Sequence, residues 1–368
     1  MMHREVRSGT VLAATALFGV VNACVAQPRP LAPLPPIQRF IPKDNPMTPE
    51  KIALGKMLYF DPRLSGDSST SCAKCHDPEQ GFSNGKQLSD AYPGTKHWRS
   101  VPTILNAAYA ELLFWDGRSP NLEDQATGPI QAPIEMNQNP ALLVEQLRQI
   151  PYYRDQFKKA FHSEISFEKI AQAIATFERT IFSRNVPFDY YLKGDESALD
   201  DEQINGLALF KGKANCIACH HGPLLSDGKL HALGVPEIEP LRKDSDRIAT
   251  RHFFAKDAGY RNYRIDADYG RELISKSRED RFKFKTPSLR EVADTAPYMH
   301  NGAFITLEQL VDFYDRGGGN IPNKDPRLKP LHLTEDEKED LISFLESLSG
   351  DPHHIQAPQL PKKDDGTF

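Results

Sequence analysis

The feature that most constrains this chain is a five-residue motif, Cys-x-x-Cys-His, which occurs twice in 368 residues. This motif is the attachment sequence of c-type haem. Two thiols one helical turn apart bond covalently to the porphyrin, so the adjoining histidine lies under the iron as proximal ligand. The sequence therefore predicts two covalently bound haem c groups. Their attachment and ligand residues would be Cys72, Cys75, His76, Cys216, Cys219 and His220.

Three other uses of the motif compete with this interpretation. A redox-active cysteine pair or a simple disulfide needs no histidine after the second cysteine, yet both copies have one. A zinc site would need four ligands brought together from both motifs. The only cysteine outside the motifs is Cys24. Two copies with no other cysteine after residue 24 favour haem attachment.

The first 26 residues have the pattern of an export signal. Arg4 and Arg7 form a basic start, residues 11–21 are apolar, and small residues end the segment. We therefore expect residues 1–26 to be a signal peptide and the mature protein to be periplasmic. A lipoprotein signal with Cys24 as the lipidated residue is the less favoured alternative.

The charge and the hydrophobic pattern exclude two classes of partner. The formal net charge is −5 and no basic cluster occurs, so we expect no nucleic-acid partner. No long apolar run follows the N-terminus, so we expect no transmembrane span in the mature chain.

The two motifs are too far apart for one small cytochrome domain, since His76 and His220 are separated by 144 positions. Similar apolar segments, residues 54–60 and 206–210, precede them and are typical of a helix packed on a haem edge. We predict a mainly α fold with two cytochrome c-like haem domains from a duplicated module, joined by long loops. The expected divisions are a signal peptide (1–26), a Pro-rich leader (27–47), an N-terminal domain (48–198), a C-terminal domain (199–350) and a flexible tail (351–368).

Several further segments occur together in a specific order. They are Phe-Asp-Pro-Arg-Leu-Ser at 60–65, Pro-Thr-Ile-Leu-Asn at 102–106, Phe-Trp-Asp-Gly-Arg at 114–118, Gln-Ala-x-Gly-Pro at 125–129, Glu-Met at 135–136, Lys-Thr-Pro-Ser-Leu-Arg at 285–290 and Ala-Pro-Tyr-Met-His-Asn-Gly at 296–302. With both haem motifs, they make the chain resemble the bacterial di-haem cytochrome c peroxidases from about Pro49 to Leu348.

The resemblance implies that the first haem reacts with hydrogen peroxide. It also implies that Glu135 is the acid/base, with Gln125 beside it. Heterolytic cleavage of peroxide moves a proton from one oxygen to the other, and a carboxylate over an open iron face can do this. Trp115 would lie between the haems and relay electrons, as the bridging tryptophan of the family does.

Two departures from the family pattern concern the iron ligands. Where many members hold a second histidine on the first haem, this chain has Tyr92; His97 is out of register and is interpreted as a loop residue. The first haem is then expected to be open. Tyr314 replaces the methionine ligand of the second haem, which is the pattern of the MauG branch. A phenolate is a hard ligand that favours high oxidation states of iron.

Met299 is the rival ligand of the second iron, and His300 is expected near that haem but not on it. The family also holds a calcium ion between the haems. The corresponding positions here are Ser100, Thr295 and Pro297, and Ser100 replaces an asparagine. A hydroxyl is a weaker calcium ligand than an amide carbonyl, so a calcium site is a secondary expectation.

These residues leave three hypotheses for function. The first is a MauG-like peroxidase that takes electrons from a small periplasmic c-type cytochrome or cupredoxin, passing them from the C-terminal haem through Trp115 to the N-terminal haem. The second is a protein-modifying oxidase of the MauG type, acting on Trp or Tyr residues of a partner protein. The third is a non-catalytic electron carrier, which is disfavoured because a carrier needs neither Glu135 nor Gln125.

Overall fold

The computed structural model describes residues 28–89, 92, 94 and 96–362, so the expected signal peptide lies outside the described residues. Within these ranges the chain is mainly helical, as predicted. One antiparallel pair of strands occurs there, β1 (Leu230–Ala232) and β2 (Lys283–Lys285), with Leu230 opposite Lys285. None of the helices in the described ranges is long and apolar enough to cross a membrane.

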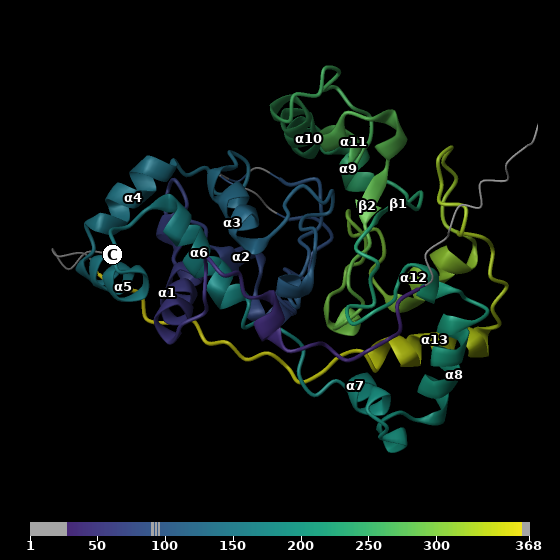
Figure 1. Ribbon diagram of the computed structural model, residues 1–368. Coiled ribbons are helices and arrows are strands. Elements are labelled where there is room, and N and C mark those ends of the chain that lie inside the picture. The colour runs from purple at the N-terminus through teal and green to yellow at the C-terminus, as the bar shows by residue number, and fades with distance from the viewer. Residues whose placement is uncertain (1–27, 90–91, 93, 95, 363–368) are drawn as a thin grey trace, which may run out of the picture.

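The helices form two groups that lie side by side, with α1 to α6 in one group and most of the later helices in the other (Figure 1). The first group consists of α1 (Pro49–Phe60), α2 (Cys72–Cys75), α3 (Leu122–Gln131), α4 (Pro140–Arg148), α5 (Pro151–Phe161) and α6 (Phe167–Glu178). The later helices are α7 (Pro187–Leu192), α8 (Asp201–Lys211), α9 (Glu239–Lys243), α10 (Ser245–Asp257), α11 (Glu272–Ser275), α12 (Leu307–Asp315) and α13 (Glu335–Glu346).

The start of each main helix follows from its sequence. Thr48 accepts a hydrogen bond from the backbone N–H of Lys51, and a proline occupies the first turn of α1. Asp200 and Thr334 each form a reciprocal capping box at the start of α8 and α13. Of these two helices, α8 leads into the second haem motif and α13 packs across α8.

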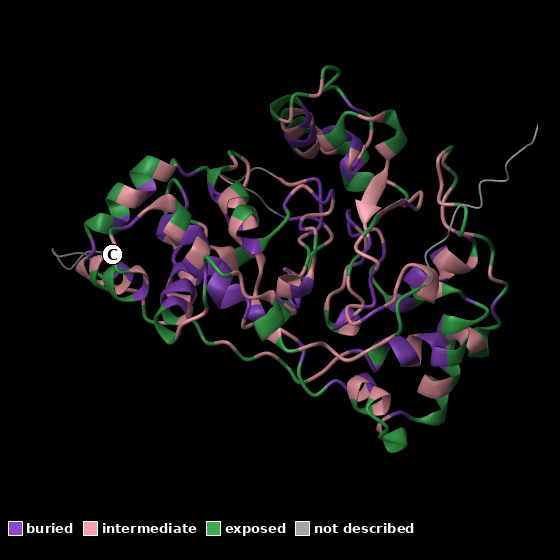
Figure 2. Cartoon of the chain, in the orientation of Figure 1, coloured by how far each residue is buried: buried purple, intermediate pink, exposed green. Residues whose placement is uncertain are grey.

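Both groups are built around one kind of helix crossing, which confirms the duplicated module. α1 crosses α6 at Gly55, where an added Cβ would lie 1.9 Å from the carbonyl oxygen of Ala173. α8 crosses α13 at Gly206, where it would lie 2.0 Å from the oxygen of Asp340. Only glycine permits backbones to approach so closely. Buried residues concentrate on these facing helix surfaces (Figure 2).

The core of the second module includes residues that precede the predicted boundary at residue 198. Val186 and Phe188 pack in the core of the second module, where the rings of Phe188 and Phe344 are 5.2 Å apart. α7 therefore belongs to the second module, because its buried aromatic ring has its partners there. The loop between α6 and α7 is the connection.

The two ends of the chain run across both modules. Arg29 in the leader donates to the backbone oxygen of Ser226 in the second module, and the leader then leads to α1 in the first. The tail leaves α13 and returns along the first module (Figure 1). There His353 packs on Phe82, and Pro361 accepts a hydrogen bond from Arg63. Residues 351–362 thus have no helix or strand but do have defined contacts, which the prediction of a flexible tail did not include.

A segment that sequence analysis did not single out links the modules on the opposite side. Residues 238–282, here called the cover segment, contain α9, α10 and α11. The segment belongs to the second module by sequence, yet Leu241 packs with Leu88 and Trp98 of the first. Lys96 also pairs with Asp244 at 2.8 Å.

Candidate di-haem centre

One cavity of about 1330 Å³ extends from the first haem motif to the second. A pocket for a single small ligand usually measures roughly 300–1,000 Å³, so this cavity has room for more than one. Its lining includes all six motif residues predicted to attach the haems, namely Cys72, Cys75, His76, Cys216, Cys219 and His220.

The two motif histidines are held in the same way. Nδ1 of His76 lies 3.2 Å from the carbonyl oxygen of Phe82, and Nδ1 of His220 lies 2.8 Å from that of Leu225. A carbonyl can only accept, so each Nδ1 carries the proton and each Nε2 is free to ligate. Burial lowers the pKa of both imidazoles, that of His220 to about 4, which keeps them in the neutral form that binds iron.

The four motif cysteines are not joined in disulfides, which contradicts the disulfide alternative. Burial raises the pKa of the Cys216 thiol to about 12 and that of Cys219 to about 11. The motifs also lie on separate modules, as a four-ligand zinc site would not allow. Free thiols, neutral histidines and one shared cavity fit two covalently attached haem groups.

At the second motif, Tyr314 faces the cavity from α12. Burial, and then the nearby Cys216 and Cys219 sulfurs, raise the pKa of its phenol. No described residue forms a hydrogen bond with its hydroxyl, which leaves the oxygen available to a metal. Met299 lines the same cavity, while His300 stacks on Phe284 with ring centroids 3.7 Å apart.

The first module lacks a counterpart of Tyr314. Equivalent landmarks in the two modules differ by 185 positions: Gly117 and Gly302 have φ of 65° and 62°, and Asn121 and Thr306 cap α3 and α12. By this spacing Tyr314 corresponds to Pro129 on α3. A proline side chain has no atom that can ligate iron, so Pro129 offers the first iron no ligand.

Glu135 follows α3 in the chain and faces the cavity. Gln125, which lies on α3, faces the same cavity. Burial by itself would raise the pKa of Glu135. The hydrogen bonding and charge of His97, followed by the charges of Arg118 and His76, outweigh burial and lower it overall. Glu135 is therefore ionised at neutral pH and can accept a proton.

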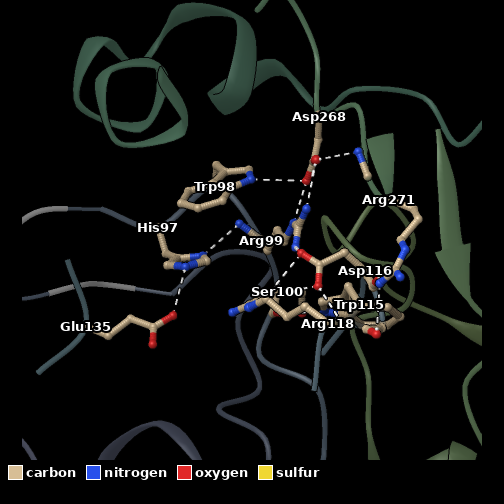
Figure 3. A network of polar contacts seen from close by, with 12 residues as sticks. His97, Trp98, Arg99, Ser100, Trp115, Asp116, Arg118, Glu135, Asp268 and Arg271 are labelled. Carbon is tan, nitrogen blue, oxygen red and sulfur yellow. Dashed lines mark hydrogen bonds and ion pairs between the residues drawn. The ribbon is translucent and has the colours of Figure 1, made fainter. Parts of the chain in front are cut away.

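The interpretation of His97 as only a loop residue was incomplete. Its backbone lies in a loop, but its side chain is directed at Glu135, with Nε2 3.4 Å from Oε1 (Figure 3). Its spacing from Trp115 gave no sign of this, because the contact depends on how the loop folds over α3. Tyr92 also lines the cavity, and its backbone N–H donates to the oxygen of Ile134.

Trp115 lies where the modules meet. Its indole N–H donates to the backbone oxygen of Ser100 at 2.9 Å, and its own oxygen accepts from the N–H of Lys285 at 2.8 Å. Next to it, Asp116 is fully buried between Arg99 and Arg118 (Figure 3). Burial would raise the pKa of Asp116, but the two guanidinium groups lower it overall.

The residues predicted for calcium all line the cavity. Ser100 already uses its backbone oxygen to accept from Trp115 and its N–H to donate to His300. The hydroxyl of Thr295 donates to the oxygen of Glu291, and Pro297 follows a cis peptide bond. Calcium binding by Ser100, Thr295 and Pro297 stays a prediction.

Known proteins have sequences similar to that of this chain. The sequence model of the family described as di-haem cytochrome c peroxidase matches residues 49–197. The chain is 48% identical to the cytochrome-c peroxidase IdrP1 of Pseudomonas sp. (strain SCT), over 90% of this chain and 89% of that one. It is 40% identical to the methylamine utilization protein MauG of Methylorubrum extorquens, over 87% and 84% of the two chains.

A solved structure agrees with these relatives. The crystal structure of a MauG-like protein associated with microbial copper homeostasis superposes with a TM-score of 0.72 and 31% identity, over 90% of this chain and 96% of that one. The shared cavity, the paired motifs and these relatives lead to one conclusion. The chain belongs to the di-haem cytochrome c peroxidase family, a family of peroxidases that includes MauG.

Proposed function

We propose that the chain uses hydrogen peroxide as oxidant at the first haem, with Glu135 as the group that moves the proton. One observation carries this proposal: the first site has the carboxylate of Glu135, and it has Pro129 at the position that Tyr314 holds in the second site. An open iron face with an ionised carboxylate suits peroxide, whereas a filled coordination position suits electron transfer.

The reduction of one peroxide to two waters takes two electrons and two protons. The haem irons supply the electron chemistry when they are bound. Glu135 accepts a proton from the incoming peroxide and returns it to the departing oxygen, which leaves as water. Gln125, on the preceding helix α3, lines the same part of the cavity and can donate a hydrogen bond to the peroxide.

The electrons for this reaction would pass from the second haem through Trp115 to the first. Two hydrogen bonds at Trp115 support this route: the oxygen of Ser100 holds the indole N–H, and the backbone oxygen of Trp115 accepts from the N–H of Lys285 in the second module. The electron donor would be a small c-type cytochrome or a cupredoxin, since the expected signal peptide directs the chain to the periplasm.

A second candidate function is the oxidation of Trp or Tyr residues on a partner protein, as proposed for a MauG-type enzyme. Tyr314 at the second iron favours it, because a phenolate stabilises oxidised iron more than a thioether does. The identity of 40% to a protein named MauG is consistent with this alternative.

The test compares Glu135→Gln with the wild type by stopped-flow absorbance after mixing with peroxide. Glutamine has the same shape but cannot accept the proton, so the rate constant should fall about 10²- to 10⁴-fold. Glu145→Gln, an exposed carboxylate on α4, is the matched control. A wild-type rate for Glu135→Gln would show that Glu135 is not the acid/base.

Electron paramagnetic resonance separates the two candidate functions. One high-spin and one low-spin haem at rest, with both signals fading after one equivalent of peroxide and no matching organic radical, would indicate that both irons share the oxidation. That result supports the MauG-type function. Two low-spin haems that ignore peroxide until one electron is added would indicate a hidden ligand on the first iron and an ordinary peroxidase.

A further inference from the structure

We propose that His97 is the positioning residue of Glu135, holding one carboxylate oxygen with its Nε2–H so that the other oxygen faces the peroxide. The inference rests on the proposed function of Glu135 and adds the residue that aims it. It also connects that function to the cover segment, which comes from the other module.

The backbone decides which nitrogen of His97 carries the proton. The N–H of Arg99 donates to Nδ1 of His97 at 3.0 Å. A backbone N–H can only donate, so Nδ1 must be the acceptor and the proton of the neutral ring is on Nε2. Nε2 lies 3.4 Å from Oε1 of Glu135. This contact is long, as those of catalytic groups often are without substrate.

The imidazole plane is fixed by stacking. His97 and Trp98 are nearly parallel, with ring centroids 4.3 Å apart and an interplanar angle of 12°. Trp98 is 1% exposed, and its indole N–H donates to Asp268 of the cover segment at 3.1 Å. Arg99 donates hydrogen bonds to the same carboxylate from two nitrogens, at 2.6 and 2.9 Å (Figure 3).

The cover segment also holds the backbone of His97. Arg247 on α10 donates to the oxygen of His97 and to that of Ser89, the latter at 3.0 Å. The N–H of His97 donates to the same Ser89 oxygen at 3.0 Å. The ring is therefore fixed at its main chain, its plane and its Nδ1, and Nε2 has one direction left, toward Glu135.

This arrangement makes His97 a donor and not a relay. A proton added at Nδ1 would face the N–H of Arg99, so two donors would point at each other. The charge of Arg118 also acts on Glu135 from the cavity wall. His97 therefore acts as a hydrogen-bond donor to the carboxylate, while Glu135 carries the proton in the reaction.

The test uses the holoprotein with His97→Phe and His97→Gln. Phenylalanine keeps the stack on Trp98 but has no donor, so the rate constant with peroxide should fall about 10- to 100-fold. Glutamine retains an N–H near the position of Nε2 and should restore the rate to within about threefold of wild type. His354→Phe, at an exposed position of the tail, is the control for an added ring.

Two readouts separate positioning from packing. Without the donor, Glu135 takes up its proton at higher pH, so the acidic limb of the pH–rate profile should move upward in His97→Phe. Fluoride binding to the ferric protein, followed by absorbance, should tighten at neutral pH, because a neutral carboxyl repels the anion less. The resting spectra of both haems should not change.

The outcomes distinguish this inference from the proposed function. If Glu135→Gln reacts slowly while His97→Phe has the wild-type rate, pH profile and fluoride affinity, only the role of His97 is overturned. If His97→Gln reacts as slowly as His97→Phe, the role of His97 as a donor is also overturned, because restoring an N–H would then have no effect. A wild-type rate for Glu135→Gln would overturn the proposed role of Glu135 and, with it, this inference.

Discussion

In the first module Pro129 stands at the position that Tyr314 has in the second, on helices that start 185 residues apart. The frames around these positions are alike. Each has a glycine at the main helix crossing, Gly55 or Gly206, and a motif histidine held by a backbone carbonyl. One frame therefore serves two kinds of haem site, and the residues that face the iron make the difference.

A second difference lies behind the motifs. By the alignment of the helix crossings, which places Phe177 on Phe344, Glu178 of α6 corresponds to Leu345 of α13. Both line the cavity. Burial raises the pKa of Glu178 to about 8, and one of its oxygens has no hydrogen-bond partner among the described residues. At this position the first module thus carries a carboxyl group where the second has an apolar side chain.

The third difference is dependence on the other module. The polar residues of the first site, His97 above all, are held by the cover segment, which is an insertion in the second module. Reactive sites need positioned polar groups, and these need partners that a small module cannot supply by itself. Five substitutions test this comparison, from the largest expected effect on stability to the smallest.

The largest effect is expected for Asp268→Asn, which removes the negative charge that the cover segment places beside Arg99. Arg99 keeps its ion pair with Asp116, but breaking the buried pair with Asp268 should cost up to about 3–5 kcal/mol of unfolding free energy. Hydrogen exchange of α10 should speed up, and Asp246→Asn, exposed on the same helix, is the control. Unchanged exchange in α10 would mean that the cover segment stays bound without this carboxylate.

The same residue gives a pH prediction. Burial would raise the pKa of Asp268, but Arg99 outweighs burial and lowers it. The folded pKa is then below the unfolded value of about 3.9. The stabilisation is complete above that value and is lost as pH falls. Acid unfolding of the wild type should therefore show a pH-dependent loss that Asp268→Asn lacks.

A smaller loss is expected for Gly55→Ala and Gly206→Ala. Alanine is the better helix former by about 1 kcal/mol, but the added carbon would overlap a carbonyl oxygen. Overpacking should cost about 1–3 kcal/mol or more. If the modules unfold separately in urea, each variant should shift the transition of its own haem only. Equal shifts of both haem signals would show that the modules unfold together.

A change of about 1 kcal/mol at pH 5 is expected for Glu178→Leu, which copies Leu345. The raised pKa of Glu178 means that the folded state prefers the protonated form. Stability of the wild type is therefore highest below the unfolded pKa of about 4.3 and falls by up to about 1.4 kcal/mol per pH unit from there to the folded pKa of about 8. Denaturant curves at pH 5 and 6 should show this slope, and Glu178→Gln should remove it as well. A wild-type slope in Glu178→Gln would assign the dependence to another group.

The smallest change in stability is expected for Tyr314→Met, which keeps an apolar stem of similar length. Its effect is on the second haem, whose reduction potential should rise, because a thioether favours ferrous iron and axial ligands tune potentials over about 0.8 V. Redox titration followed by absorbance measures this. An unchanged potential in both Tyr314→Met and Tyr314→Phe would show that the phenol does not ligate the iron.

The sequence alone determined the chemistry that depends on near neighbours. A Cys-x-x-Cys-His segment places two thiols and an imidazole within one turn, whatever the rest of the chain does, so both haem sites were predictable. The helix starts at Thr48, Asp200 and Thr334 were equally local. Family resemblance added Glu135 and Trp115, which the structure places on the cavity wall.

Only the tertiary structure decided what surrounds these groups. His97 and Glu135 are 38 positions apart, and their contact depends on Arg99, Trp98 and Asp268 meeting from distant segments. α7 joins the second module because its buried ring fits there, and no local pattern shows that. A local motif specifies a bond by covalent geometry, whereas these contacts arise from packing and charge across both modules.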